Sequence, residues 1–206
     1  VDDGASSARG LDGHVEHGVQ VCRGHELCEE RGRDCAMAAT IRRFYPPVMD
    51  VCSVKTRFVL IETSHAGNVG GAARAMKVMG FDDLVLVRPR WPNVLRREET
   101  IQRASGANGV LDAARVVETL DEALDGITHL CATAMTPRDF GPPTRTPRAH
   151  LEPLARDWSG GGGVAFLFGS ERFGMANADV YRSHVCLSIP TAPDFGSLNL
   201  AAAVQL

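Results

Sequence analysis

The sequence predicts an α/β fold in which helices cover a parallel β-sheet. Three observations support this prediction. Short apolar runs rich in β-branched residues recur along residues 57–206, and runs without polar alternation are typical of strands buried on both faces. Segments with helical periodicity lie between these runs. Glycine and proline separate the two kinds of segment, and strands that alternate with helices in this way favour a parallel, covered sheet.

The expected elements follow in chain order. Strands are expected at residues 58–61, 84–87, 115–117, 128–133, 164–168 and 185–189. Helices are expected at residues 72–79, within 98–107, at 121–124, at 176–181 and from residue 197 onwards. Gly67, Gly70 and Gly71 are expected to turn the chain before the first helix, and Gly80 to end that helix. Asp121 is expected to cap the helical turn that follows it.

Other segments are predicted to lack regular structure. Residues 137–153 are proline-rich, and a loop of that length would serve as a lid or be disordered. Residues 159–163 are expected to form a flexible joint, because a phosphate-binding loop follows a strand and this segment precedes one. Residues 1–55 mix glycine, charge and isolated apolar residues, so a disordered or irregular segment is predicted there. Met49 is the expected natural start, with upstream translated sequence before it.

The apolar runs, the start of the sequence and the net charge limit where the protein is expected to be located and what it is expected to bind. No apolar run approaches the ~20 residues of a membrane span, and the start lacks the features of a secretory signal. We therefore expect a cytoplasmic protein without membrane contact. The net charge of −3 comes from residues 1–50, and the remainder is neutral, so any surface for nucleic acid must be local.

One local basic segment surrounds Trp91. Its arginines are Arg88, Arg90, Arg96, Arg97 and Arg103. A solvated arginine-rich loop is the alternative interpretation, because Glu98 and Glu99 lie in the same segment.

Six cysteines are spread along the chain. Cys131 and Cys186 lie in apolar, strand-like runs and are expected to be buried, unreactive thiols. The first three cysteines lie near histidines, but no two of them are spaced as a C-x-x-C pair. Known zinc patterns need such a pair or a close equivalent. No metal site is therefore expected. These residues are Cys22, Cys28 and Cys35, with His14, His17 and His25.

Three separated motifs carry the polar residues of a candidate site. The first (NVGGAAR) runs from Asn68 to Arg74 and follows Glu62-Thr-Ser-His; the second (FGSERFG) contains Glu171; the third (FGSLNLAAA) contains Ser197 and Asn199. Asn68 is expected in a turn and Arg74 in the next helix, both facing the carboxyl ends of the strands, where open α/β sheets bind ligands. Helix caps, a salt bridge and a surface arginine are the structural alternatives.

In this order and spacing, the motifs resemble the signature motifs of the SpoU/TrmH branch of the SPOUT RNA 2'-O-methyltransferases, and most closely those of the TrmJ type. The resemblance covers about residues 57–206. It implies that the C-terminal segment threads a loop to form a trefoil knot, with the chain ending inside the knot helix. It also implies a homodimer, and a methyltransferase domain over residues 56–206 that is truncated at its C-terminus.

The resemblance implies a role for each polar motif residue. Arg74 would be catalytic, Asn68 would hold Arg74 or the RNA, and Glu171 would orient Arg74 or Asn199. Ser197 and Asn199 would face the reacting centre. Guanidinium hardly deprotonates in proteins, so Arg74 would hold the target phosphate and stabilise the developing 2'-alkoxide. Alternatively, a phosphate or water accepts the proton while Arg74 orients it.

The implied cofactor is S-adenosyl-L-methionine, held mostly by backbone groups of the knot-forming loops. The residues matched to it are Thr133, Ala134, Met135, Gly169, Ile189, Gly196, Ser197 and Leu198. Gly169 would let the cofactor approach the backbone closely.

The implied substrate is tRNA, at the ribose of residue 32 in the anticodon loop. Only RNA has a 2'-hydroxyl, so DNA is not expected as a partner. Alternatives within the family are ribosomal RNA, another tRNA position, or a knot protein that binds RNA without turnover. A dinucleotide-dependent oxidoreductase is disfavoured, because no G-x-G-x-x-G turn is followed by an acidic residue ~20 positions later.

Overall fold

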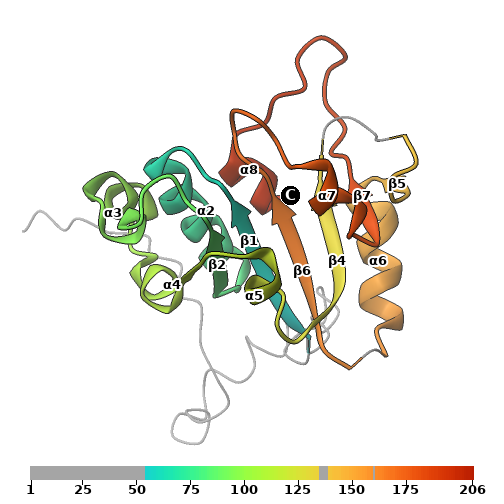
Figure 1. Cartoon of the computed structure of the whole chain (residues 1–206), viewed down its shortest axis with the longest axis horizontal. Helices are drawn as coiled ribbons and strands as arrows, with labels where there is room; N and C mark the ends of the chain where they lie inside the picture. Colours follow the sequence, from blue (N-terminus) through green and yellow to red (C-terminus); the bar gives the residue numbers. More distant parts are fainter. Residues whose placement is uncertain (1–53, 135–138, 160) are drawn as a thin grey trace, which may run out of the picture. The chain divides into compact units, whose positions relative to one another are not determined.

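The computed structural model describes residues 54–134, 139–159 and 161–206. Within these residues, seven strands form one sheet in the order β3-β2-β1-β6-β4-β7-β5 (Figure 1). All pairings between these strands are parallel, which confirms the predicted α/β class. The strands are β1 (Lys55–Ile61), β2 (Asp83–Val87), β3 (Arg115–Val117), β4 (Ile127–Thr133), β5 (Thr144–Arg145), β6 (Gly163–Phe168) and β7 (Val185–Leu187).

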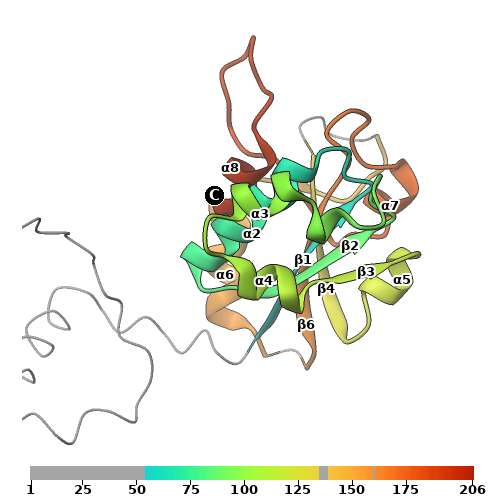
Figure 2. The same cartoon turned by 90° about the vertical axis from the view of Figure 1, so that its left-hand side faces the viewer.

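Helices cover both faces of this sheet. They are α2 (Ala66–Met79), the 3-10 helix η2 (Val94–Arg96), α3 (Glu98–Ala104), α4 (Asn108–Ala113), α5 (Leu120–Ala123), α6 (Pro147–Asp157), α7 (Asn177–Tyr181) and α8 (Leu200–Gln205). Figure 2 shows α2, α3, α4, α6 and α8 on one side of the strands, and α5 and α7 on the other. None of the helices in the described ranges combines the length and apolar character that a membrane crossing requires.

Strand β1 shows why the central strands read as continuous apolar runs. Phe58 and Leu60 pack on the face covered by α2, while Val59 and Ile61 pack on the face covered by α5 and α7. All four are at most 4% exposed. Because successive side chains of a strand point to opposite faces, both faces must be apolar when helices cover both.

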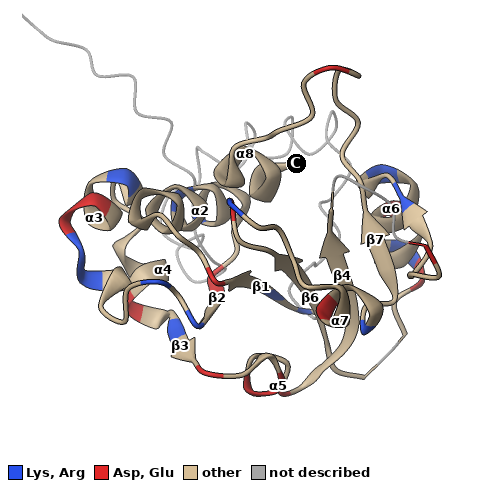
Figure 3. Ribbon diagram, turned by 45° about the horizontal axis from the view of Figure 1, so that its top comes forward, with Lys and Arg blue, Asp and Glu red and all other residues tan. Residues whose placement is uncertain are grey.

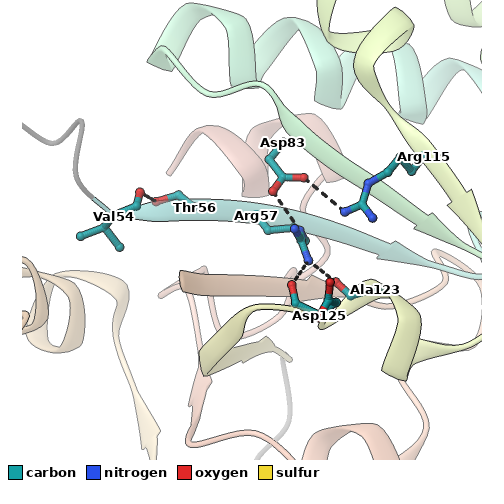
Figure 4. A network of polar contacts seen from close by, with 7 residues as sticks. All are labelled: Val54, Thr56, Arg57, Asp83, Arg115, Ala123 and Asp125. Atoms are coloured by element: carbon teal, nitrogen blue, oxygen red, sulfur yellow. Dashed lines mark hydrogen bonds and ion pairs between the residues drawn. The ribbon is translucent and has the colours of Figure 1, made fainter. Parts of the chain in front are cut away.

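One charged side chain breaks this apolar pattern in β1. Arg57 is 2% exposed, and its Nε donates to Asp83 Oδ2 over 2.9 Å. Its terminal nitrogen donates to the carbonyl oxygens of Ala123 and Asp125, at 2.7 and 2.9 Å. Figure 4 shows the guanidinium between the start of β2 and the segment that follows α5. This network satisfies a buried cation and joins three segments far apart in the sequence.

Helix α2 starts six residues earlier than predicted. Gly67, Gly70 and Gly71 were expected to turn the chain, but all three lie inside the helix. A Cβ at Gly70 would lie 2.1 Å from the Thr100 carbonyl oxygen, and one at Gly71 would lie 3.2 Å from Ala201 Cβ. These glycines therefore allow α3 and α8 to approach α2 closely. Gly80 ends the helix in a left-handed conformation, as predicted.

The segment after β2 contains two helices where one was expected. Ser105 and Gly106 both have positive φ values, 45° and 85°, and this break separates α3 from α4. The next helix, α5, is capped by Thr119, whose side chain accepts the Glu122 N–H, and Asp121 lies inside the helix. The cap was therefore predicted two residues too late.

The largest error concerns residues 137–153, where a loop was predicted. Residues 137–138 lie outside the described residues, and the remainder contains β5 and most of α6. Pro147 occupies the first turn of α6, where a missing N–H costs nothing, and Thr146 caps that turn. Pro153 lies inside the helix. The number of prolines suggested a loop, but the first of them lies in the first turn of a helix, where proline is favoured.

Other boundaries moved by a few residues. Gly163, assigned to a flexible joint, starts β6, and β7 ends at Leu187, two residues early. The last helix begins at Leu200, where a start from Ser197 was expected. Cys131 and Cys186 are buried, as predicted. The predictions for residues 1–53, including Cys22, Cys28 and Cys35, concern residues outside the described ranges.

Candidate active site at the carboxyl ends of the strands

A cleft of about 500 Å³ lies where β4, β6 and β7 end and α8 begins. Its lining brings together residues from all three sequence motifs. The predicted residues among them are Asn68, Thr133, Ala134, Gly169, Glu171, Ile189, Gly196, Ser197, Leu198 and Asn199. Apolar side chains complete the wall: Phe168, Met175, Leu187 and Leu200. Met135 lies outside the described residues, and Arg74 is not part of the lining.

The carboxylate of Glu171 anchors one end of this cleft. Its Oε1 accepts hydrogen bonds from the Thr63 hydroxyl (2.7 Å) and from Asn68 Nδ2 (2.8 Å). Its Oε2 accepts the backbone N–H and the hydroxyl of Ser64, both at 2.8 Å. Thr63 and Ser64 are buried and lie just beyond the end of β1, after Glu62. The second motif is thereby tied to the end of β1 and to the first motif.

These donors also determine the charge of Glu171. Desolvation of the carboxylate acts to raise its pKa, but the hydrogen bonds from Ser64, Asn68 and Thr63 outweigh it and lower the pKa to about 2. Hydrogen bonds to the ionised form stabilise that form. Glu171 is therefore an anion at neutral pH, and a carboxylate this acidic is a poor general base.

Asn68 and Arg74 do not meet, although they belong to one motif. Asn68 lies in the first turn of α2, and its amide contacts Glu171. Six helical positions correspond to a rotation of about 240°, so Arg74 points to a different side of α2. Arg74 is exposed and has no hydrogen bond or ion pair with the described residues. The expectation that both face the carboxyl ends of the strands is wrong for Arg74, because it assumed a turn at Asn68.

The expected partners of Glu171 also differ from the observed ones. Arg74 or Asn199 was expected, but the four hydrogen bonds of the carboxylate go to Thr63, Ser64 and Asn68. Thr63 and Ser64 were not singled out from the sequence. Their position within three residues of the end of a buried strand was the available signal, because such residues gather at the same edge of a parallel sheet.

The third motif contributes the start of α8. Asn199 caps this helix, since its side-chain oxygen accepts the Ala201 N–H over 2.9 Å. Ser197, for which a helix cap was the structural alternative, lies in the segment before α8 and lines the cleft. Helix α8 packs through Leu200 and Val204 into the same apolar cluster as α2. The packing of α8 thus holds the polar pair Ser197 and Asn199 at the cleft.

Gly169 lines the cleft, and the structure gives a reason for this glycine other than the expected approach of the cofactor. A Cβ there would lie 2.5 Å from the Gly174 carbonyl carbon and from the Met175 nitrogen. The space that a side chain would occupy is therefore filled by the chain itself, at the base of the loop between β6 and α7. That loop closes through hydrogen bonds between the backbones of Ser170 and Gly174.

The arginine-rich segment adjoins the cleft. The Arg90 N–H donates to the carbonyl oxygen of Thr63, whose hydroxyl contacts Glu171. The guanidinium groups of Arg90 and Arg97 lie over the ring of Trp91, 4.8 and 4.5 Å from its centroid. Figure 3 shows basic positions gathered around α3, next to this segment. Arg88 has a different role, because it pairs with Glu62.

Comparisons with known proteins agree with this architecture. Residues 55–206 match the model of the SpoU rRNA Methylase family. The tRNA (cytidine/uridine/adenosine-2'-O-)-methyltransferase TrmJ of Pseudomonas aeruginosa (strain UCBPP-PA14) is 46% identical over 153 residues, which cover 74% of this chain and 58% of that protein. The chain thus spans less than two thirds of the length of this relative.

Solved structures show the same fold. A probable methyltransferase from Bordetella pertussis Tohama I is 44% identical, with a TM-score of 0.67 over 74% of this chain and 91% of that chain. TrmJ from Z. mobilis ZM4 is 38% identical, with a TM-score of 0.65 over 73% and 65% of the two chains. The family model, these identities and the parallel sheet lead to one conclusion: the chain belongs to the SpoU methylase family.

Proposed function

We propose that this protein transfers a methyl group from S-adenosyl-L-methionine to a ribose 2'-oxygen of tRNA, at residue 32 of the anticodon loop. The observation that carries the proposal is the convergence of Asn68, Glu171, Ser197 and Asn199 in one cleft. These residues come from three motifs spread over more than 130 positions. The names of the TrmJ relatives support tRNA as the substrate and the 2'-oxygen as the target.

The residues of the cleft fit the cofactor. Its volume of about 500 Å³ lies within the range of small-molecule sites, about 300–1,000 Å³. Loop segments at Thr133–Ala134, Ile189 and Gly196–Leu198 would hold the cofactor, with Thr133 fixed by a hydrogen bond to the Leu167 carbonyl oxygen. When bound, the cofactor supplies a methyl group that its sulfonium has already activated. The ionised Glu171 gives the wall a negative charge that complements a cation.

The polar side chains offer the groups needed to orient a hydroxyl. Asn68 donates its Nδ2 to Glu171, which leaves Oδ1 as an acceptor. Asn199 accepts the Ala201 N–H through Oδ1, which leaves Nδ2 as a donor. Ser197 supplies a hydroxyl that can do either. Holding a ribose between such groups aligns its 2'-oxygen and accounts for a large part of a methyl-transfer rate.

We also propose the knot and the homodimer that the family resemblance implies. Helix α8 packs on α2 after the chain has passed through β7 on the far side of β6 and β4, which is compatible with a threaded C-terminal segment. Arg74 does not line the cleft of its own subunit. In a homodimer it would act at the partner's cleft, where its guanidinium would hold a phosphate of the RNA and stabilise the developing 2'-alkoxide.

A methyl-transfer assay with tritiated cofactor tests the proposal. We expect labelling of bulk tRNA, and mapping of the 2'-O-methyl marks should place them at residue 32. Labelling of ribosomal RNA or of another tRNA position would favour the alternative substrates. Cofactor and tRNA binding without labelling would support a knot protein without turnover, and absence of cofactor binding would contradict the proposal as a whole.

The arginines over Trp91 predict the salt dependence of tRNA binding. Replacing Arg90 and Arg97 together with alanine should weaken binding and reduce the slope of log K against log[salt] by about 2, since each phosphate contact contributes about 0.9. Replacing Arg148 and Arg156, two exposed arginines of α6, makes the same change in net charge and serves as the control. Equal slopes for the two double variants, measured by filter binding, would favour the solvated-loop interpretation.

A further inference from the structure

A cluster of histidines and a cysteine lies under α6, on the same face of the sheet as α2. His129 and Cys131 are alternate residues of β4, so their side chains point to the same face. His150 lies on α6, which covers that face. One ligand atom from each of these three residues lies within 4.8 Å of the other two. The cleft is formed at the end of the same strand, by Thr133 and Ala134, so the cluster lies outside the cleft.

The distances suit a tetrahedral metal ion. Zinc binds histidine nitrogen at about 2.0–2.1 Å and thiolate sulfur at about 2.3 Å, so tetrahedral neighbours are separated by about 3.3–3.6 Å. The Nε2 atoms of His129 and His150 lie 3.1 Å apart. The widest ligand spacing, within 4.8 Å, would close by roughly 1 Å on binding, which is within the reach of side-chain adjustments.

An irregularity in β4 helps to direct the side chain of His129 toward Cys131 and His150. Between Ile127 and His129 the register of β4 against β6 shifts by one residue, because Ile127 pairs with Gly163 and His129 with Val164. A bulge of this kind redirects the side chains that follow it, and bulges are enriched next to functional sites. After this shift, His129 and Cys131 both point to the face of the sheet that α6 covers.

A fourth residue, His184, supports the cluster without joining it. Its Nδ1 accepts the Leu130 N–H over 3.0 Å, so a neutral His184 carries its proton on Nε2 and has no lone pair to offer a metal. Its ring stacks on His129 with centroids 4.8 Å apart. Three protein ligands therefore remain, which leaves a fourth tetrahedral position for water.

The two histidines are in the neutral form that metal binding requires, whereas the cysteine loses its proton only when a metal binds. Desolvation and the neighbouring His184 and His150 lower the pKa of His129, and desolvation and Arg145 lower that of His150, so both rings are neutral at pH 7. Burial raises the pKa of the Cys131 thiol to about 12. A bound divalent cation deprotonates a coordinating thiol outright, and the thiolate would offset the repulsion from Arg145.

We propose that His129, Cys131 and His150 form a binding site for a divalent transition metal, Zn²⁺ in the first place, which ties α6 to the sheet. Two histidine nitrogens and a thiolate form a ligand set of the borderline-soft kind that zinc prefers. The tie has a structural use, because none of the residues of α6 is fully buried and Pro153 interrupts its hydrogen bonding. His129 and Cys131 are two positions apart and His150 follows 19 positions later, and this spacing contains no C-x-x-C pair of the kind that zinc patterns use.

Titration of the full chain with Co²⁺ tests the site. The wild type should show near-ultraviolet absorption from a thiolate–cobalt bond and quenching of Trp158, whose ring meets His129 edge-on. Cys131→Ser and His150→Gln should each lose one metal equivalent or bind it at least about 10-fold more weakly. The difference from wild type isolates the site from any metal held by the cysteines of residues 1–53.

Cys186→Ser is the matched control. Cys186 is also buried, but it pairs with Ala132 and so points to the opposite face of the sheet from Cys131. We expect this variant to bind like the wild type, and Zn²⁺ to raise the Tm of both but not that of His150→Gln. Unchanged metal binding in Cys131→Ser and His150→Gln would overturn the proposal and leave a hydrogen-bonded histidine pair. Equal loss in Cys186→Ser would overturn it too, because the signal would then follow folding.

Discussion

Replacing Glu171 with glutamine is expected to lower tRNA methylation by about 100-fold while the chain stays folded. The carboxylate accepts four hydrogen bonds, two at each oxygen. Glutamine has only one acceptor oxygen, so its NH₂ group must face either the Ser64 N–H or the Asn68 amide. If Asn68 rotates to relieve the conflict, it presents a donor to the cleft in place of an acceptor. The variant thus alters the group that is proposed to orient the ribose.

The measurement is kcat/KM for methyl transfer, with Glu118→Gln as the control. Glu118 is exposed, and its side chain makes no hydrogen bond or ion pair with the described residues. The free energy of unfolding should fall by only about 1 kcal/mol in Glu171→Gln, after allowance for partial solvent exposure. Full activity of Glu171→Gln would show that the anchor is dispensable and would contradict the proposed role of Asn68.

The same carboxylate makes that stability difference depend on pH. The pKa of Glu171 in the folded protein is about 2, below the ordinary 4.5. A group whose pKa is lowered on folding stabilises the protein above its unfolded pKa, and this contribution disappears as the pH falls through the folded pKa. The Tm difference between wild type and Glu171→Gln should therefore be constant above pH 5 and shrink between pH 4.5 and 2.

Replacing Arg57 with methionine should have the largest effect on stability, a loss of about 3–5 kcal/mol. The substitution removes the cation from between Asp83 and two carbonyl oxygens, those of Ala123 and Asp125. These carbonyl groups lose their donor, and a buried acceptor without a partner is costly. Because Arg57 joins β1 to β2 and to the segment before β4 (Figure 4), the loss affects the middle of the sheet.

Arg115→Met provides the comparison. Arg115 approaches the same Asp83 at 3.7 Å, but its side chain is 47% exposed. Its replacement should cost at most about 1 kcal/mol, as is usual for surface ion pairs. Urea unfolding of the two variants measures the difference, and equal midpoints would show that burial adds nothing to the Arg57 network.

The strands of this fold were predictable because helices cover both of their faces. Residues 84–87 and 164–168 are continuous apolar runs, and the structure has strands there. Predictions failed where one residue type serves two purposes. Gly70 was read as a turn residue, but it is a contact residue between α2 and α3. Pro147 was read as a loop residue, but it lies in the first turn of α6.

Many of the residues that line the cleft could be predicted from the sequence, with Arg74 as an exception, but their contacts could not. Motifs after successive strands converge on one edge of a parallel sheet, so residues such as Ser197 and Asn199 could be placed together from the sequence alone. Contacts between pairs of residues depend on the side of a helix on which each residue lies. An error in the predicted start of the helix changes that side. Once α2 begins at Ala66, Asn68 lies at the Glu171 carboxylate and Arg74 points elsewhere. No local sequence pattern could predict the strand order or the cluster of His129, Cys131 and His150.

The position of β6 beside β1 has a consequence for how the protein is made. Arg57 pairs with Ala165, so the middle of the sheet joins residues more than 100 positions apart. A ribosome adds about 5–20 residues per second, and β1 therefore waits several seconds for its neighbour. During that time the edge of β1 that pairs with β6 has no partner, and an unpaired apolar strand edge favours association with other chains.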